Sequence, residues 1–164
     1  MTDNLRRTLL ACGLLLLAVS GVRADNEPPQ DLATFPQSRL TIVTRSGALD
    51  FQIWTAETNS QRMQGLMYVR DLAADRGMLF VEERPRVAGM WMKNTYIPLD
   101  LLFMDARGKI VRILPMTKPL SLNVLSSQVP VKAVLELRGG EAARRNIRVG
   151  DIVQHAAFVA KKRR

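Results

Sequence analysis

Residues 90–100 read Met-Trp-Met-Lys-Asn-Thr-Tyr-Ile-Pro-Leu-Asp, and this stretch is the most informative part of the chain. A lysine, an asparagine, a threonine and an aspartate stand inside a run that is otherwise strongly apolar and contains a proline turn. A polar group buried without a hydrogen-bond partner costs roughly 1–3 kcal/mol, so these side chains must find partners. The stretch is therefore predicted to be either a polar brace for a turn or the floor of a binding site.

Short β-like runs separated by turns lie on both sides of this stretch. Leu40–Thr44 and Leu49–Thr55 flank a predicted hairpin turn. Further strands are expected at residues 77–81, 87–95, 99–105, 110–116, 132–137 and 152–159, with a charged loop at 82–86, a turn at 105–109 and a surface loop at 115–130. A helix is expected over 61–69, capped by Thr58 or Asn59, and a shorter one over 140–146. The pattern predicts a mainly β protein: a compact antiparallel β sandwich or barrel with one or two short α-helices.

The N-terminal residues have the layout of a secretory signal peptide. Arg6 and Arg7 precede an apolar run at 9–20, and Val22-Arg23-Ala24 is a small-x-small cleavage site. Residues 1–24 are therefore predicted to be removed on export, which makes the protein periplasmic or secreted. A lipobox-like sequence ending at Cys12 is the alternative. Residues 25–38 are expected to form a proline-rich linker, 39–160 a single domain and 161–164 a basic tail.

Composition excludes several classes of function. Cys12 is the only cysteine, so the mature chain would have no disulfide, no thiolate nucleophile and no cysteine-ligated metal. The formal net charge is +9, but four of these charges belong to the tail at 161–164. We therefore expect no nucleic-acid partner, and at most peripheral membrane contact through this tail. No cofactor or metal is expected. Thioether binding of Cu(I) is the alternative role for the methionines, although methionine usually fills gaps in a core.

Five motifs occur along the chain in a fixed order. They are Arg62-x-x-Gly65-Leu66-Met67-x-x-Arg70, Gly77-Met78-Leu79-Phe80, the 91–100 block with Phe103, Leu135-Glu136-Leu137 followed by Gly139 or Gly140, and Gly150-Asp151. In this order and spacing they resemble the domain of unknown function 192 family over about residues 39–158. The resemblance implies a compact β-rich fold, frequently exported in bacteria, without an agreed activity or cofactor. The chain differs from the family at Glu82, where a second aromatic residue is frequent.

The polar residues of these motifs form a candidate ligand site. The hypothesis gathers them around one concave patch, with the 91–100 segment at its centre: Arg62, Trp91, Lys93, Asn94, Thr95, Asp100 and Glu136. An arginine with a lysine can hold a carboxylate or a phosphate. Aromatic rings beside amide and carboxylate groups suit a sugar. The predicted partner is a small polar or anionic ligand, such as a saccharide or a carboxylate, or another protein.

Two alternatives remain open at this stage. In the first, Asn94 and Thr95 bond the turn backbone, and Lys93 forms an ion pair with Glu136 or Asp100. In the second, Lys93, Asp100 and Glu136 serve a hydrolase- or lyase-type enzyme that acts on a small periplasmic substrate. The motifs contain no Ser-His-Asp set, no Gly-rich phosphate loop and no histidine, so no catalytic residue is assigned. An exported binding module of unknown specificity is the function that the sequence favours.

Overall fold

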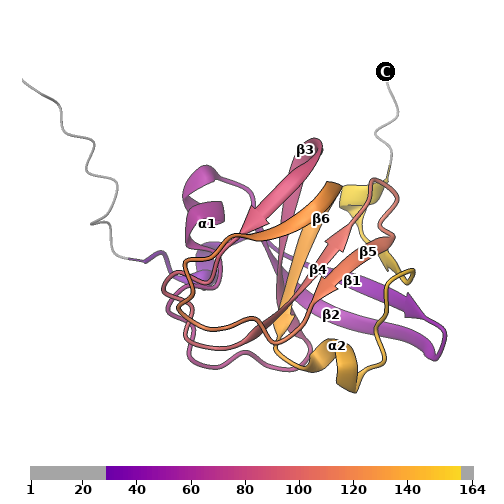
Figure 1. Cartoon of the computed structure of the whole chain (residues 1–164), viewed down its shortest axis with the longest axis horizontal. Helices are drawn as coiled ribbons and strands as arrows, with labels where there is room; N and C mark the ends of the chain where they lie inside the picture. Colours follow the sequence, from indigo (N-terminus) through magenta and orange to yellow (C-terminus); the bar gives the residue numbers. More distant parts are fainter. Residues whose placement is uncertain (1–28, 160–164) are drawn as a thin grey trace, which may run out of the picture.

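The computed structural model describes residues 29–159. Its main feature is one curled seven-stranded sheet (Figure 1). The strands are β1 (Gln37–Thr44), β2 (Gly47–Ala56), β3 (Arg76–Met90), β4 (Leu99–Met104), β5 (Ile110–Leu114), β6 (Leu125–Arg138) and β7 (Ile152–Gln154). Their order in the sheet is β5-β4-β6-β3-β2-β1-β7. The curled sheet forms a half-barrel. Its two ends, near β5 and at β7, meet only at an isolated bridge between Lys109 and Ile152. The prediction of a mainly β, barrel-like fold is confirmed.

All named strand pairs are antiparallel except one. β2 and β3 run parallel, and the crossover between them contains α1 (Asn59–Gln64). Thr58 caps this helix in a capping box with Gln61, whereas Gly65 ends it with a φ of +52°. The predicted helix over 61–69 is therefore wrong in its extent. The other helices are α2 (Glu141–Arg144) and the 3-10 turns η1 (Leu32–Thr34) and η2 (Ala156–Phe158). Within residues 29–159, no helix has the length and apolar character needed to cross a membrane.

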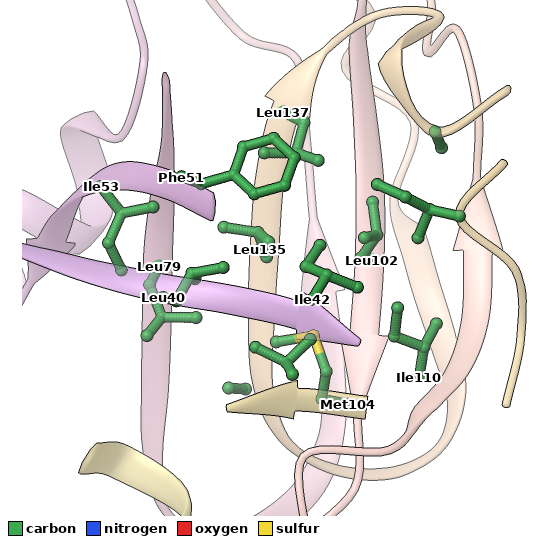
Figure 2. Close-up of a cluster of buried hydrophobic side chains, with 14 residues drawn as sticks. Leu40, Ile42, Phe51, Ile53, Leu79, Leu102, Met104, Ile110, Leu135 and Leu137 are labelled. Atoms are coloured by element: carbon green, nitrogen blue, oxygen red, sulfur yellow. The ribbon is translucent and has the colours of Figure 1, made fainter. Parts of the chain in front are cut away.

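Both faces of the sheet carry a hydrophobic core. Inside the curl, β1 and β2 face β4 and β6 through Leu40, Ile42, Phe51, Leu102 and Leu135 (Figure 2). On the other face, α1 and its following loop cover a second cluster that contains Met78, Phe80, Leu101, Phe103 and Val134. Burial on both faces explains why every residue of β4 is buried, although the strand alternates between the two clusters as its sequence predicts.

Four predicted segments have the wrong bounds. β3 continues through the charged segment 82–86, with a register irregularity in its pairing to β6, and then ends at Met90. The strand predicted over 87–95 therefore stops early, because the Thr95 N–H bonds the Met92 carbonyl in a turn (3.1 Å). β6 begins at Leu125, which shortens the predicted surface loop to 115–124. The last predicted strand ends at Gln154 and is followed by η2.

The predicted linker is partly folded. Asp31 caps η1, and Phe35 is buried in the cluster that α1 covers. The folded part of the chain therefore begins before residue 39. The predicted signal peptide (1–24) and basic tail (161–164) lie outside the described residues.

Candidate functional site

The segment after β3 is a braced turn rather than a strand. Asn94 has a φ of +55°, and its carbonyl accepts the Tyr68 N–H at 2.8 Å. Its side-chain Nδ2 donates to the Tyr68 hydroxyl at 2.9 Å. Thr95 is buried, and its Oγ1 donates to the Lys93 carbonyl at 3.3 Å. Asn94 therefore holds the turn against the loop that follows α1, whereas the Thr95 side chain braces the turn internally.

Asp100 is a second brace, located on β4. Its side chain is fully buried, yet both of its oxygens have partners. Oδ1 accepts the backbone N–H groups of Met116 (2.8 Å) and Gly140 (2.9 Å). Oδ2 accepts the N–H of Ala142 at 2.8 Å. The carboxylate thus ties the loop after β5 and the start of α2 to the sheet, and each of its two oxygens accepts at least one hydrogen bond.

Glu136 on β6 is the one predicted site residue with an uncompensated polar group. It is 4 % exposed, and its Oε2 has no hydrogen-bond partner. Across the sheet it is paired with Met78 on β3 and Leu101 on β4, so its same-face neighbours are apolar. Burial raises the pKa of this carboxyl from 4.5 to about 8. At neutral pH the group is therefore mainly an uncharged carboxylic acid.

The C-terminal end of α1 covers this carboxyl. A Cβ atom placed on Gly65 would lie 4.0 Å from Glu136 Oε2 and 3.2 Å from Phe80 Cζ. Gly65 also has a positive φ, which favours glycine on conformational grounds. The end of the helix can thus approach the carboxyl closely because this position has no side chain.

The cationic members of the predicted set lie elsewhere. Lys93 is exposed, and none of the ion pairs within residues 29–159 includes it, so the predicted pairing with Glu136 or Asp100 is not formed. Trp91 is also exposed. Arg62 on α1 donates from Nε to the Ala56 carbonyl at 3.3 Å. The predicted residues therefore do not form one concave patch. Asp100 and Glu136 are buried on opposite faces of the sheet, whereas Arg62, Trp91 and Lys93 are exposed.

Arg62 lines two adjoining clefts of about 730 and 440 Å³ that sequence reasoning missed. Both clefts also contain Val81 and η2 residues, and the larger one includes Lys132, whose Nζ donates to the Glu83 carbonyl at 3.1 Å. These groups come from distant parts of the chain, so no local sequence signal could have identified them together.

His155 borders the smaller cleft as a structural residue. Its Nδ1 accepts the Ala157 N–H at 3.2 Å, so the proton of the neutral ring is on Nε2, which faces Ser38 Oγ at 3.0 Å. Burial lowers the pKa of this imidazole. In this tautomer the ring donates to the serine and does not remove its proton, and the arrangement therefore gives no support to a serine nucleophile.

Three arginines, two of them about half exposed, surround the buried carboxylate of Glu141 in α2. Burial acts to raise its pKa, but hydrogen bonds from Arg144, Arg138 and Arg145 outweigh this and lower the pKa to about 2. The contacts include Arg138 Nη2 to Oε1 at 2.6 Å and Arg145 Nε to Oε2 at 3.1 Å. Arg144 and Arg145 follow Glu141 by three and four residues, which is a helical ion-pair signal that sequence reasoning missed, whereas Arg138 reaches the carboxylate from the end of β6.

Three of the seven methionines in residues 29–159 have a packing role, whereas Met63 and Met116 are both 58 % exposed. Met78, Met92 and Met104 are fully buried among apolar side chains of the two clusters. Among the described residues, no three His, Cys, Asp or Glu side chains are grouped as metal ligands.

Comparison with known proteins identifies the family. Residues 41–155 match the model of DUF192, described as "Uncharacterized ACR, COG1430". The chain belongs to this family, whose function is unknown. A search of curated proteins finds no match.

Two solved structures are similar over nearly their whole length. One is a "putative transcription regulator" from Sinorhizobium meliloti 1021, with 41 % identity and a TM-score of 0.73, covering 75 % of this chain and 96 % of that one. The other is a protein of unknown function from Novosphingobium aromaticivorans DSM 12444, with 32 % identity and a TM-score of 0.74, covering 80 % of this chain and 94 % of that one.

Proposed function

We propose that the protein is a binding module for a small polar ligand and that the Glu136 carboxyl is its polar anchor. One observation carries the proposal: Oε2 of Glu136 is buried without a hydrogen-bond partner. Leaving such a group unsatisfied costs roughly 1–3 kcal/mol, and a leucine at the same position would avoid this cost. A bound donor would supply the missing partner. Buried groups with strongly shifted pKa values are more frequent at functional sites than elsewhere.

Asp100 supports this interpretation by contrast. It is buried at least as deeply as Glu136, but three backbone N–H groups bond its carboxylate, so both oxygens have partners. The fold therefore satisfies a buried carboxylate where that group serves as a brace. Glu136 joins no segments in this way, so a bracing role does not explain its presence.

The chemistry of the site restricts the ligand. A carboxyl with a pKa of about 8 is mainly protonated at pH 7, so it can donate one hydrogen bond and accept another. A hydroxyl group would use both functions, as in a saccharide. A ligand ammonium group would instead remove the proton and pair with the carboxylate. Because the end of α1 at Gly65 covers the carboxyl, entry requires this end of the helix to move.

A thermal-shift screen with a matched control tests the proposal. The panel contains monosaccharides, short-chain amines and short-chain carboxylates, each added to wild type, Glu136→Leu and Glu83→Leu. Glu83 is an exposed carboxylate on β3, so its substitution should leave binding intact. Glu136→Leu should fold at least as stably as wild type, because its neighbours are apolar. We expect one class of compound to raise the Tm of wild type and Glu83→Leu only.

An equal rise in the Tm of Glu136→Leu would contradict the role of Glu136 as the anchor. The Lys93→Ala variant is a second control. Lys93 is exposed and forms no ion pair among the described residues, so its loss should affect neither stability nor the binding of a ligand anchored at Glu136.

We also propose that the chain is exported, on the basis of the basic, apolar and small-residue regions at 1–24. Mass spectrometry of the protein from a periplasmic fraction tests this. A mature N-terminus at Asp25 is expected, whereas an intact N-terminus in the cytoplasmic fraction alone would contradict export. The transcription-regulator description of the S. meliloti protein is not extended to this chain, because α1 and α2 have six and four residues and form no helix-turn-helix unit.

A further inference from the structure

We propose that the loops after β3 and β5 form a membrane-contact surface for anionic lipid. Its exposed members, called the apolar loop surface below, are Trp91, Tyr96, Met116, Leu120, Leu122 and Val124. Leu122 and Val124 are 71 % and 70 % exposed, so their side chains protrude from the fold. Contiguous apolar groups in contact with water mark interaction sites more often than chance positions on the surface.

Backbone contacts join the two loops into one surface. The Met92 N–H donates to the Ser121 carbonyl at 3.0 Å, and the Leu120 N–H donates to the Thr95 carbonyl at 3.1 Å. A methyl carbon of Val124 lies 3.1 Å from the Cβ position of Gly89, near the end of β3. The exposed side chains therefore belong to a single region and not to two separate loops.

The backbone of this region is held in an unusual conformation. Met116 and Leu120 have φ values of +50° and +61°, which non-glycine residues rarely adopt. Both side chains nevertheless stay exposed, so burial in the fold does not compensate for the strain. Strained backbone tends to occur where the conformation serves a function, and here it presents apolar groups to the solvent.

The charge of the region selects the partner. No aspartate or glutamate occurs in residues 84–99 or 106–135, whereas Lys93 and Lys118 are exposed in these loops. Arg70 adds a cation beside them, with its guanidinium carbon 5.0 Å from the ring centre of Tyr96. Arg70 is followed by the exposed Asp71, so the positive charge of the region rests on Lys93 and Lys118. Protruding aliphatic groups, amphipathic aromatic rings and an excess of basic over acidic residues are the combination that binds an anionic bilayer surface.

The fluorescence of Trp91 tests this proposal in the full-length chain. Trp54→Phe removes the other tryptophan, so the emission then reports on the apolar loop surface alone. Vesicles of phosphatidylglycerol and phosphatidylcholine in equal parts should shift this emission to the blue, and brominated lipid should quench it. Phosphatidylcholine vesicles should have a much smaller effect.

Matched substitutions separate the contributions of apolar contact and charge. Leu122→Ser should weaken the response at least ten-fold, and Lys118→Glu should weaken it about five-fold or more. Val149→Ser is the control, because Val149 is also exposed but lies in the loop that faces the β1–β2 turn. Its effect should be within two-fold of wild type, roughly the scatter expected for a surface substitution.

Hydrogen exchange of wild type provides a second measurement that needs no substitution. Anionic vesicles should slow exchange in residues 115–124. The proposal is overturned if anionic vesicles change neither the Trp91 emission nor this exchange, or if phosphatidylcholine alone has an equal effect. Concentration-dependent self-association that Leu122→Ser abolishes would also overturn it, because the surface would then bind a second copy of the chain.

Discussion

Asp100 and Glu136 lie on adjacent strands but project from opposite faces of the sheet. The register of β4 and β6 pairs Asp100 with Leu137 and Leu101 with Glu136. Directly paired residues share a face, so the two carboxyl groups are separated by the sheet. One face supplies three N–H groups to Asp100, and the other surrounds Glu136 with apolar side chains. The same chemical group therefore acts as a brace on one face and stays unsatisfied on the other.

Removing the acceptor capacity of Asp100 should destabilise the fold. Asp100→Asn keeps one oxygen but places an NH₂ group against a backbone N–H, so we expect a loss of about 2–4 kcal/mol in the free energy of unfolding. Urea denaturation at pH 7 measures this loss. Asp50→Asn is the control, because Asp50 is exposed and bonds only Thr41 Oγ1, at 2.7 Å. Similar stabilities of the two variants would contradict the bracing role of Asp100.

Glu136 should make the protein less stable as the pH rises. Its pKa is about 8 in the folded state and about 4.5 in the unfolded chain. Between these values the unfolded chain has lost the proton and the folded protein has kept it, so stability falls by about 1.4 kcal/mol per pH unit. Glu136→Gln should remove this slope. Denaturation curves from pH 5 to about 8 measure it, and parallel pH profiles for the two proteins would refute the assignment.

Glu141 should show the opposite pH dependence. Its pKa is lowered to about 2, so its stabilising effect is complete above its ordinary pKa of 4.5 and is lost as the pH falls towards 2. After discounting for the exposure of Arg138 and Arg144, we expect about 2–3 kcal/mol from this group. Acid titration of stability, compared between wild type and Glu141→Gln, measures this effect. A wild-type advantage that persists at pH 2 would argue against it.

Gly77 permits the close approach of β3 to β6. A Cβ atom at this position would lie 2.5 Å from the carbonyl oxygen of Glu136 and 2.8 Å from Leu137 Cδ2. Gly77→Ala should therefore cost about 3 kcal/mol or more, because backbone atoms cannot move as easily as a side chain. Gly89→Ala on the same strand is the control: its nearest contact is a methyl group of the exposed Val124 at 3.1 Å, and we expect a loss below about 1 kcal/mol. Thermal and urea unfolding of both variants give the comparison.

Local patterning was sufficient to predict the strands near the hairpin and the alternation along β4. These features depend on a two-residue period and on turn residues, which are properties of a short segment. The extent of α1 was predicted wrongly, although Gly65 marks its end in the sequence. The strand predicted over 87–95 was too long, because the segment after Met90 also contains a buried apolar residue, Met92. An apolar residue that fills the core from a turn gives the same sequence pattern as one in a strand.

Asp100 and Glu136 could be singled out from the chain alone, because carboxylates in apolar motifs are conspicuous. Their environments depend on strand register and on the segments that cover each face. Sequence patterning could not show that three N–H groups from the loop after β5 and the start of α2 converge on Asp100. It also could not show that the end of α1 covers Glu136. Both facts arise from contacts between segments far apart along the chain, and such contacts exist only after the sheet has formed.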